Sequence, residues 1–292
     1  MPHSMDCRSP TGLGDMVKEV GGPDVQVATL VPPGGDAHVY QPRPGDAKAI
    51  ARADLVVVNG LGMEGWIDRL IAASGYKGRI ATASTGVKPQ TMAGEEDEDI
   101  DRDDKAVAKG DGRPRIVTDP HAWQNVANGE IYIRNITAAL VAIDPDHAAG
   151  YEARGQAYIA GLQGLDAWVK AQIATVPPQK RRIITSHDAF GYFGTAYGIS
   201  FLAPLGISTG ADPSAAHVGE LVRQMRAEHI RALFIENMTD PRLIQQLARE
   251  ANAVVGGTLY SDSLSKAGGP ADTYVKMFRH NVPAMVAAMQ KN

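Results

Sequence analysis

Cysteine, long apolar runs and an excess of positive charge are all missing from this sequence. Its one cysteine, Cys7, excludes an intrachain disulfide and any thiolate-rich metal cluster. No apolar run is close to the length of about 20 residues that is needed to span a bilayer. With 29 Lys plus Arg against 33 Asp plus Glu, the net charge of −4 excludes a protein organised around nucleic acid. Metal chemistry here must therefore come from histidine, aspartate and glutamate.

The composition describes a folded protein with a large core. Of the 292 residues, 44% are apolar and 21% are charged, which argues against disorder. This length allows two domains. The segment Met1 to Met5 resembles residues added in cloning, so we expect it to form no part of the fold. We also expect that an export signal has been removed. Cys7 follows no apolar signal run and is not expected to be a lipid anchor.

Short β-rich apolar runs alternate with segments of helical period. The expected strands are 25–30, 55–58, 183–185, 233–235 and 254–259. The expected helices are 46–52, 65–73, 130–142, 189–197, 220–228, 243–251 and 274–289. Such alternation is typical of crossover units, so we predict an α/β protein with mostly parallel sheets.

One long helix is predicted between two βα-rich halves. Residues 146–174 contain no proline, and their apolar positions recur at steps of three, four and seven residues. At ~1.5 Å per residue this helix reaches roughly 40 Å, the height of two lobes. We therefore predict an N-terminal lobe (1–143), a rigid connecting helix (144–176) that limits hinge motion, and a C-terminal lobe (177–292).

An acidic segment interrupts the first lobe. Residues 95–104 carry eight carboxylates against one positive charge, Arg102. Such runs repel themselves and stay solvated, so residues 93–113 are expected to form a mobile loop. A solvating insertion without a role and a weak cation-gathering role are equally compatible with this pattern.

A glycine turn at Gly60 to Gly65 matches the spacing of a dinucleotide fingerprint. That fingerprint also needs an acid at the end of the next strand, and the run 79–85 ends in Ala-Ser-Thr. We favour a tight packing turn, with a nucleotide-binding protein left as an alternative that predicts tight NAD or ATP binding.

Four polar residues stand in loops where functional groups of parallel sheets gather. His38 and His187 follow strand-like runs, His121 lies in a turn before a helix, and Asp262 follows the last strand. The remaining histidines of the main chain, His147, His217, His229 and His280, are expected to be surface or packing residues. Spacing alone does not show that the four candidates meet.

The sequence around these residues resembles bacterial solute-binding proteins that deliver zinc or manganese to ABC importers. The resemblance runs from about Leu13 to the C-terminus. It rests on blocks at 14–17 with 20–22, 30–42, 119–123, 186–193 and 259–264, including Asp36-Ala37-His38, Asp119-Pro120-His121 and Ser186-His187-Asp188.

This resemblance implies that His38, His121, His187 and Asp262 bind the metal, two from each lobe. Manganese receptors of the family usually have Glu where this chain has His187. Three imidazoles and one carboxylate suit four-coordinate Zn²⁺, with one ion per chain. Glu236 and Asp188 are candidates to orient the imidazoles, although an ordinary salt bridge is the commoner role for each.

The resemblance therefore implies a periplasmic zinc receptor that is not an enzyme. Its partner would be an ABC permease, with a periplasmic metal-donor protein as an optional second partner, and it would be a monomer. A manganese receptor of the same family and a zinc hydrolase with Asp262 as base are the alternatives. Two departures stand out: residues 93–113 contain no histidine, and Asp6 to Pro10 lack the apolar strand that the family has before Leu13.

Overall fold

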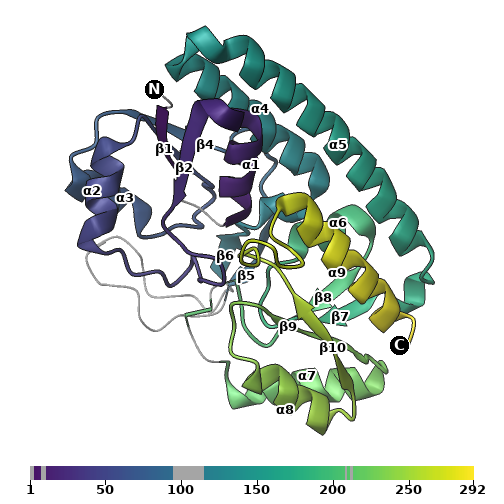
Figure 1. The fold of residues 1–292 in the computed structure, drawn as a ribbon. Helices are drawn as coiled ribbons and strands as arrows, with labels where there is room; N and C mark the ends of the chain where they lie inside the picture. The colour runs from purple at the N-terminus through teal and green to yellow at the C-terminus, as the bar shows by residue number, and fades with distance from the viewer. Residues whose placement is uncertain (1–2, 8–10, 95–114, 208, 211–212) are drawn as a thin grey trace.

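The computed structural model describes residues 3–7, 11–94, 115–207, 209–210 and 213–292. Within these ranges the chain forms two α/β lobes along one long helix (Figure 1). None of the helices in the described ranges is both long and apolar enough to cross a membrane. The α/β class and the two-lobed arrangement predicted from the alternating pattern are confirmed.

The N-terminal lobe is built on a four-stranded parallel sheet in the order β2-β1-β3-β4. Its strands are β1 (His3–Cys7), β2 (Val25–Thr29), β3 (Leu55–Val58) and β4 (Arg79–Thr82). Its helices are α1 (Thr11–Gly21), α2 (Pro44–Arg52), α3 (Ile67–Ser74) and α4 (Val126–Ile143). A separate two-stranded antiparallel sheet pairs β5 (Thr91–Gly94) with β6 (Arg115–Thr118).

The C-terminal lobe repeats this plan with a parallel sheet in the order β10-β9-β7-β8. Its strands are β7 (Arg182–Ile184), β8 (Ser200–Leu202), β9 (Ala232–Glu236) and β10 (Val254–Leu259). Its helices are α6 (Gly191–Tyr197), α7 (Ala215–Ala227), α8 (Arg242–Glu250) and α9 (Tyr274–Met289). Short 3₁₀ turns lie at Gly22–Asp24, Ala122–Gln124, Pro145–His147 and Pro178–Lys180.

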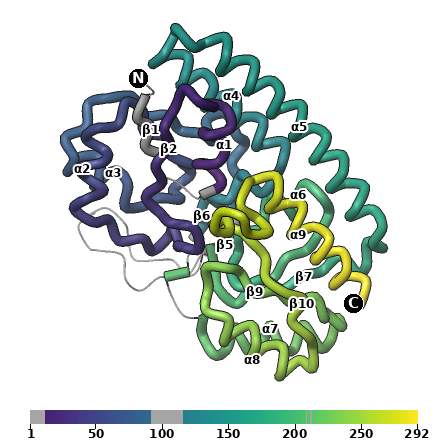
Figure 2. Tube along the Cα trace, in the orientation of Figure 1, coloured from purple at the N-terminus to yellow at the C-terminus, as the bar shows by residue number. Residues whose placement is uncertain are grey.

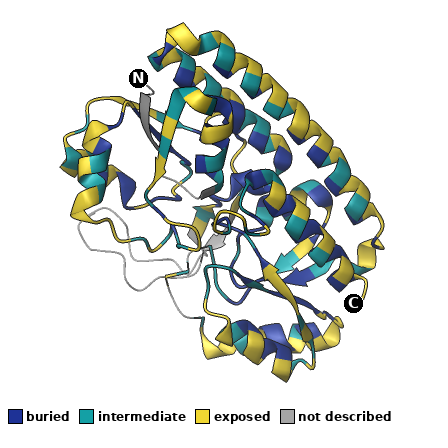
Figure 3. Ribbon diagram, in the orientation of Figure 1, coloured by how far each residue is buried: buried dark blue, intermediate teal, exposed yellow. Residues whose placement is uncertain are grey.

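The connecting helix α5 (Ala148–Ala174) runs past both lobes, as Figure 2 also shows. Its buried residues Tyr151, Leu162, Leu165, Val169 and Ile173 belong to one hydrophobic core that continues from α1 to α9. Figure 3 shows the exposed residues of α5 on its outward side. A second, smaller core lies between α7, α8 and the C-terminal sheet. Since one close-packed core is shared by both lobes, large hinge motion between them would expose apolar surface.

Three expectations need correction. Residues 1–5 were excluded from the fold, yet β1 pairs with β2 and β3 inside the first sheet. The sequence His-Ser-Met-Asp-Cys has no apolar pattern from which a strand could be predicted. The strand is stabilised by backbone pairing with a neighbouring strand on each side. Helix α1 was not predicted, since Gly12, Gly14 and Gly21 lower its helix propensity. The loop expected at 93–113 starts inside β5, and its part from 95 to 113 lies outside the described residues.

Candidate metal centre

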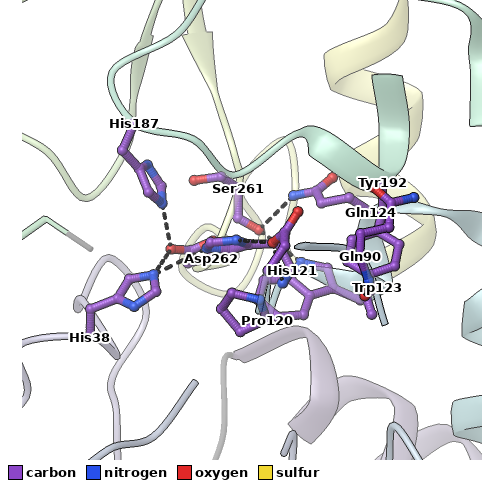
Figure 4. A network of polar contacts seen from close by, with 12 residues as sticks. His38, Gln90, Pro120, His121, Trp123, Gln124, His187, Tyr192, Ser261 and Asp262 are labelled. Carbon is purple, nitrogen blue, oxygen red and sulfur yellow. Dashed lines mark hydrogen bonds and ion pairs between the residues drawn. The ribbon is translucent and has the colours of Figure 1, made fainter. Parts of the chain in front are cut away.

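The structure brings His38, His121, His187 and Asp262 together between the lobes (Figure 4). His38 lies in the loop after β2 and His121 follows β6, whereas His187 follows β7 and Asp262 follows β10. One ligand atom from each residue lies within 4.8 Å of all the others. The carboxyl ends of the strands in both sheets therefore face one another across this point.

The facing atoms are ring nitrogens and carboxylate oxygens. Nε2 of His38 lies 3.1 Å from Nε2 of His121 and 3.3 Å from Oδ2 of Asp262. Nε2 of His187 lies 3.1 Å from Oδ2 of Asp262, and Nε2 of His121 lies 3.5 Å from its Oδ1. Two unprotonated imidazole nitrogens 3.1 Å apart repel each other through their lone pairs, unless one of them carries a proton or both bind the same cation.

The site is almost closed to solvent. The side chains of His121, His187 and Asp262 are fully buried, and that of His38 is 6% exposed. Burial lowers the pKa of His38, and this effect outweighs the neighbouring carboxylate of Asp262. Burial raises the pKa of Asp262, but the adjacent His121 and His187 more than reverse it and hold the pKa well below its usual range. Asp262 is therefore a carboxylate at neutral pH.

His121 is oriented by an aspartate two residues earlier. Oδ1 of Asp119 accepts the backbone N–H of His121 at 2.9 Å and lies 2.8 Å from its ring Nδ1. Burial lowers the pKa of His121, but the carboxylates of Asp262 and Asp119 raise it to about 9. With Nδ1 facing Asp119, Nε2 is directed into the site, where its lone pair can bind a metal once the ring has lost its second proton. Asp119 stood in the Asp-Pro-His motif but was not predicted to have this role.

His187 is held by Glu236 at the end of β9. Oε1 of Glu236 accepts the backbone N–H of His187 at 2.9 Å, and Oε2 lies 2.8 Å from Nδ1, although not aligned for a hydrogen bond. Burial lowers the pKa of His187, but Glu236 and Asp262 together raise it well above its usual range. The partner of Glu236 is thus an imidazole of the site, the position expected of a group that orients His187. In the described residues no contact joins the carboxylate of Asp188 to an imidazole of the site.

The loop that carries Asp262 is fixed to the opposite lobe. The carbonyl oxygen of Ser261 accepts hydrogen bonds from Nε1 of Trp123 and Nε2 of Gln124, both at 3.1 Å. The hydroxyl of Ser261 donates to Oε2 of Glu236, the same carboxylate that faces His187. The positions of Asp262, His187 and His121 are therefore coupled through buried polar contacts.

The glycine turn at Gly60 is tightly packed, and two of its backbone N–H groups already have an acceptor in the protein. Gly60 has a φ of +84°, and a Cβ there would lie 2.5 Å from Cγ2 of Thr82. The carboxylate of Glu64 accepts the backbone N–H groups of Asn59 at 2.8 Å and Gly60 at 3.4 Å. The carboxylate of Glu64 thus already accepts the N–H groups that a phosphate would need, which supports the packing turn and argues against nucleotide binding.

The other histidines lie away from this site. His147 is half-exposed and pairs with Asp144 at 2.7 Å, while Nε2 of His280 lies 3.0 Å from the carbonyl oxygen of Thr258. His217 approaches the carbonyl oxygen of Ala203 at 3.2 Å, and His229 is exposed in a left-handed turn. These are the surface and packing roles that were expected for them.

Comparison with known proteins identifies the family. Residues 9–288 match the sequence profile described as "Zinc-uptake complex component A periplasmic". The chain belongs to this family. It is therefore a substrate-binding receptor of a metal-uptake system and not an enzyme, and the hydrolase alternative is wrong.

Relatives and solved structures resemble nearly the whole chain. The manganese-binding lipoprotein MntA of Bacillus subtilis is 30% identical over 283 residues, which cover 95% of this chain and 87% of that protein. The periplasmic zinc-binding protein TroA of Treponema pallidum is 26% identical, with a TM-score of 0.86 and 99% of each chain covered. A manganese-bound periplasmic metal-binding protein of Candidatus Liberibacter asiaticus is 31% identical, with a TM-score of 0.81 over 98% of this chain and 99% of that one.

Proposed function

We propose that this protein is a high-affinity zinc receptor that captures Zn²⁺ between its lobes and delivers it to an ABC transporter permease. The observation that carries this proposal is the convergence of three buried imidazoles and one buried carboxylate from four separate loops. Buried histidines and acids gather in this way when they bind a cation, since otherwise they cost desolvation energy.

The spacing of the donor atoms supports one shared divalent ion. A tetrahedral Zn²⁺ with bonds of about 2.0–2.1 Å places its donors roughly 3.3 Å apart. Four separations between donors in this site run from 3.1 to 3.5 Å, the one to His121 from Oδ1 of Asp262 and the other two of Asp262 from Oδ2, and one donor atom from each residue lies within 4.8 Å of the others. An ion at the centre would thus be reached by His38, His121, His187 and Asp262 with little rearrangement.

Zinc is favoured over manganese by the chemistry of the donors. Imidazole nitrogen suits Zn²⁺, whereas Mn²⁺ prefers carboxylate, carbonyl and water oxygens. Manganese remains the second candidate, because relatives such as MntA are named for manganese binding and the Liberibacter protein was solved with manganese bound. The metal preference of this chain is therefore the first property to measure.

The cellular setting follows from the family. Its description is periplasmic, and several relatives are named as substrate-binding lipoproteins of metal ABC transporters. We infer that the protein acts outside the cytoplasmic membrane as a monomer, with a permease as its partner and a metal-donor protein as an optional source of zinc. The lobes 1–143 and 177–292 and the connecting segment 144–176 form the units of this receptor.

The test is a titration of metal-free protein with Zn²⁺ and Mn²⁺ in competition. We expect one Zn²⁺ per chain with sub-micromolar affinity, weaker Mn²⁺ binding, and a sharp loss of zinc affinity in His38→Ala and His187→Ala. His280→Ala, which removes a histidine outside the site, serves as the matched control. Unchanged affinity in both site variants would contradict the assignment, and tighter Mn²⁺ than Zn²⁺ binding would establish the second candidate.

A further inference from the structure

His38 differs from the other two imidazoles in how it is held. The Nδ1 atoms of His121 and His187 face carboxylates of their own lobes, Asp119 and Glu236. The described residues provide no such partner for Nδ1 of His38, whose ring contacts lie on the side of the site. The orientation of His38 therefore depends on the backbone of its loop.

That loop is attached to the opposite lobe at two points. The backbone N–H of Gly34 donates to Oγ of Ser263 at 2.7 Å. The hydroxyl of Thr209 donates to Oδ2 of Asp36 at 2.5 Å, while Oδ1 of the same carboxylate accepts the backbone N–H of His38 at 2.9 Å. One carboxylate thus connects Thr209 of the C-terminal lobe to the backbone of His38 in the N-terminal lobe.

His38 is also the ligand nearest to solvent. Its side chain keeps 6% exposure, whereas the other three side chains have none. It lines an open cavity of about 680 Å³ together with Met63, Ile116 and Ile207. Ile207, which lines this cavity, lies close in sequence to Thr209, which contacts Asp36. Of the four converging residues only His38 lines this cavity, so we expect a metal ion that leaves the site to pass His38.

We propose that Thr209, supported by Ser263, is a positioning residue that holds the loop 32–38 across the lobes and sets the rate at which the metal leaves past His38. This inference rests on the proposed function, because it requires the four converging residues to bind the metal. Moving His38 away from the ion requires its loop to shift. Such a shift breaks the bonds to Thr209 and Ser263, and each lost bond lowers the barrier to release.

The experiment measures the dissociation rate of Zn²⁺ into an excess of a fluorescent chelator by stopped flow. Thr209→Val keeps the shape and removes the donor, and we expect a roughly tenfold faster release, the effect of one lost hydrogen bond to a charged group. Thr209→Ser keeps the hydroxyl and should restore the wild-type rate. Ser263→Ala should change the rate in the same direction as Thr209→Val.

The matched control is Thr195→Val. Thr195 also makes a contact between lobes, to Oε1 of Gln90 at 3.3 Å, but away from the loop of His38. An unchanged rate in Thr209→Val, an equal increase in Thr195→Val, or failure of Thr209→Ser to restore slow release would each overturn the inference. If wild-type protein binds neither Zn²⁺ nor Mn²⁺, the proposed function fails as well. Normal binding with an unchanged Thr209→Val rate ends this inference alone.

Discussion

Glu236 fixes His187 at two points, its Oε1 accepting the backbone N–H and its Oε2 facing the ring Nδ1 at 2.8 Å. One buried carboxylate therefore sets both the position of the loop and the ring nitrogen that faces the metal. Because Glu236 also accepts the hydroxyl of Ser261, it connects the loops of His187 and Asp262. In the proposed receptor this contact helps to determine how precisely two of the four candidate ligands are placed before metal binds.

Glu236→Gln is expected to weaken zinc binding by roughly 10- to 100-fold. The amide keeps the size of the side chain but loses the charge that faces His187. A competition titration against a chelator of known affinity measures the change. Glu228→Gln removes an exposed acid that pairs with Arg182 at 3.1 Å and is the control. Equal affinities of wild type and Glu236→Gln would show that this carboxylate does not support the site.

Zinc affinity is expected to fall as pH decreases, beginning near pH 9. In metal-free protein the pKa of His121 is raised to about 9 and that of His187 is raised well above its usual range. Both rings hold protons at neutral pH, so binding must release them. His38 has a lowered pKa and Asp262 is already ionised, so neither adds to this effect at neutral pH.

The affinity should fall about a hundredfold per pH unit between pH 8 and 6, since each of the two displaced protons gives one power of ten. Calorimetry in buffers of different ionisation enthalpy should report about two protons released per Zn²⁺ at pH 7. An affinity that is flat across this range would contradict the protonated state of His121 and His187.

Asp15→Asn is expected to stabilise the protein at neutral pH. Burial raises the pKa of Asp15 from its ordinary value of 3.8 to about 6, despite a backbone hydrogen bond from Tyr274 to its Oδ2 at 2.8 Å. The folded state thus binds this proton more tightly than the unfolded state. The stability it contributes is present below about pH 4 and is lost as pH rises through 6, by at most about 3 kcal/mol.

Asparagine accepts the same hydrogen bond without a charge. Urea unfolding should therefore show Asp15→Asn more stable than wild type at pH 7 and nearly equal to it at pH 4. A difference that does not vary between these pH values would mean that the charge of Asp15 is not the cause.

Gly155→Ala in the connecting helix is expected to destabilise the protein by about 1–3 kcal/mol. A Cβ at this buried position would lie 2.4 Å from Oγ1 of Thr137, where α4 and α5 approach each other. Gly164→Ala is the control, since nothing lies within 4 Å of its added Cβ and alanine favours helix by about 0.5–1 kcal/mol. Thermal melts that show both variants stabilised would exclude close packing at Gly155 as a constraint.

Much of the fold could be predicted from the sequence, because apolar residues that recur with a regular period over a long segment indicate a helix. Helix α5 was expected at 146–174 and spans Ala148–Ala174, and α9 and β10 have the expected bounds. β1 and α1 were missed, since a short mixed strand and a glycine-rich helix are stabilised by their neighbours. The lobe boundaries at 143–144 and 176–177 stay a prediction.

For the site, the sequence by itself determined which residue types could bind a metal. It has one cysteine and few histidines in loops that follow strands, and the motifs around His38, His121, His187 and Asp262 resemble those of metal receptors. Only the tertiary structure decided which groups orient them. Asp119 contacts His121 within one loop, whereas Glu236 and, in our proposal, Thr209 act through contacts that join separate loops. None of these contacts leaves a periodic trace in the chain. Two sheets that face each other with the carboxyl ends of their strands bring residues 38 to 262 to one point, and the shared core holds them there.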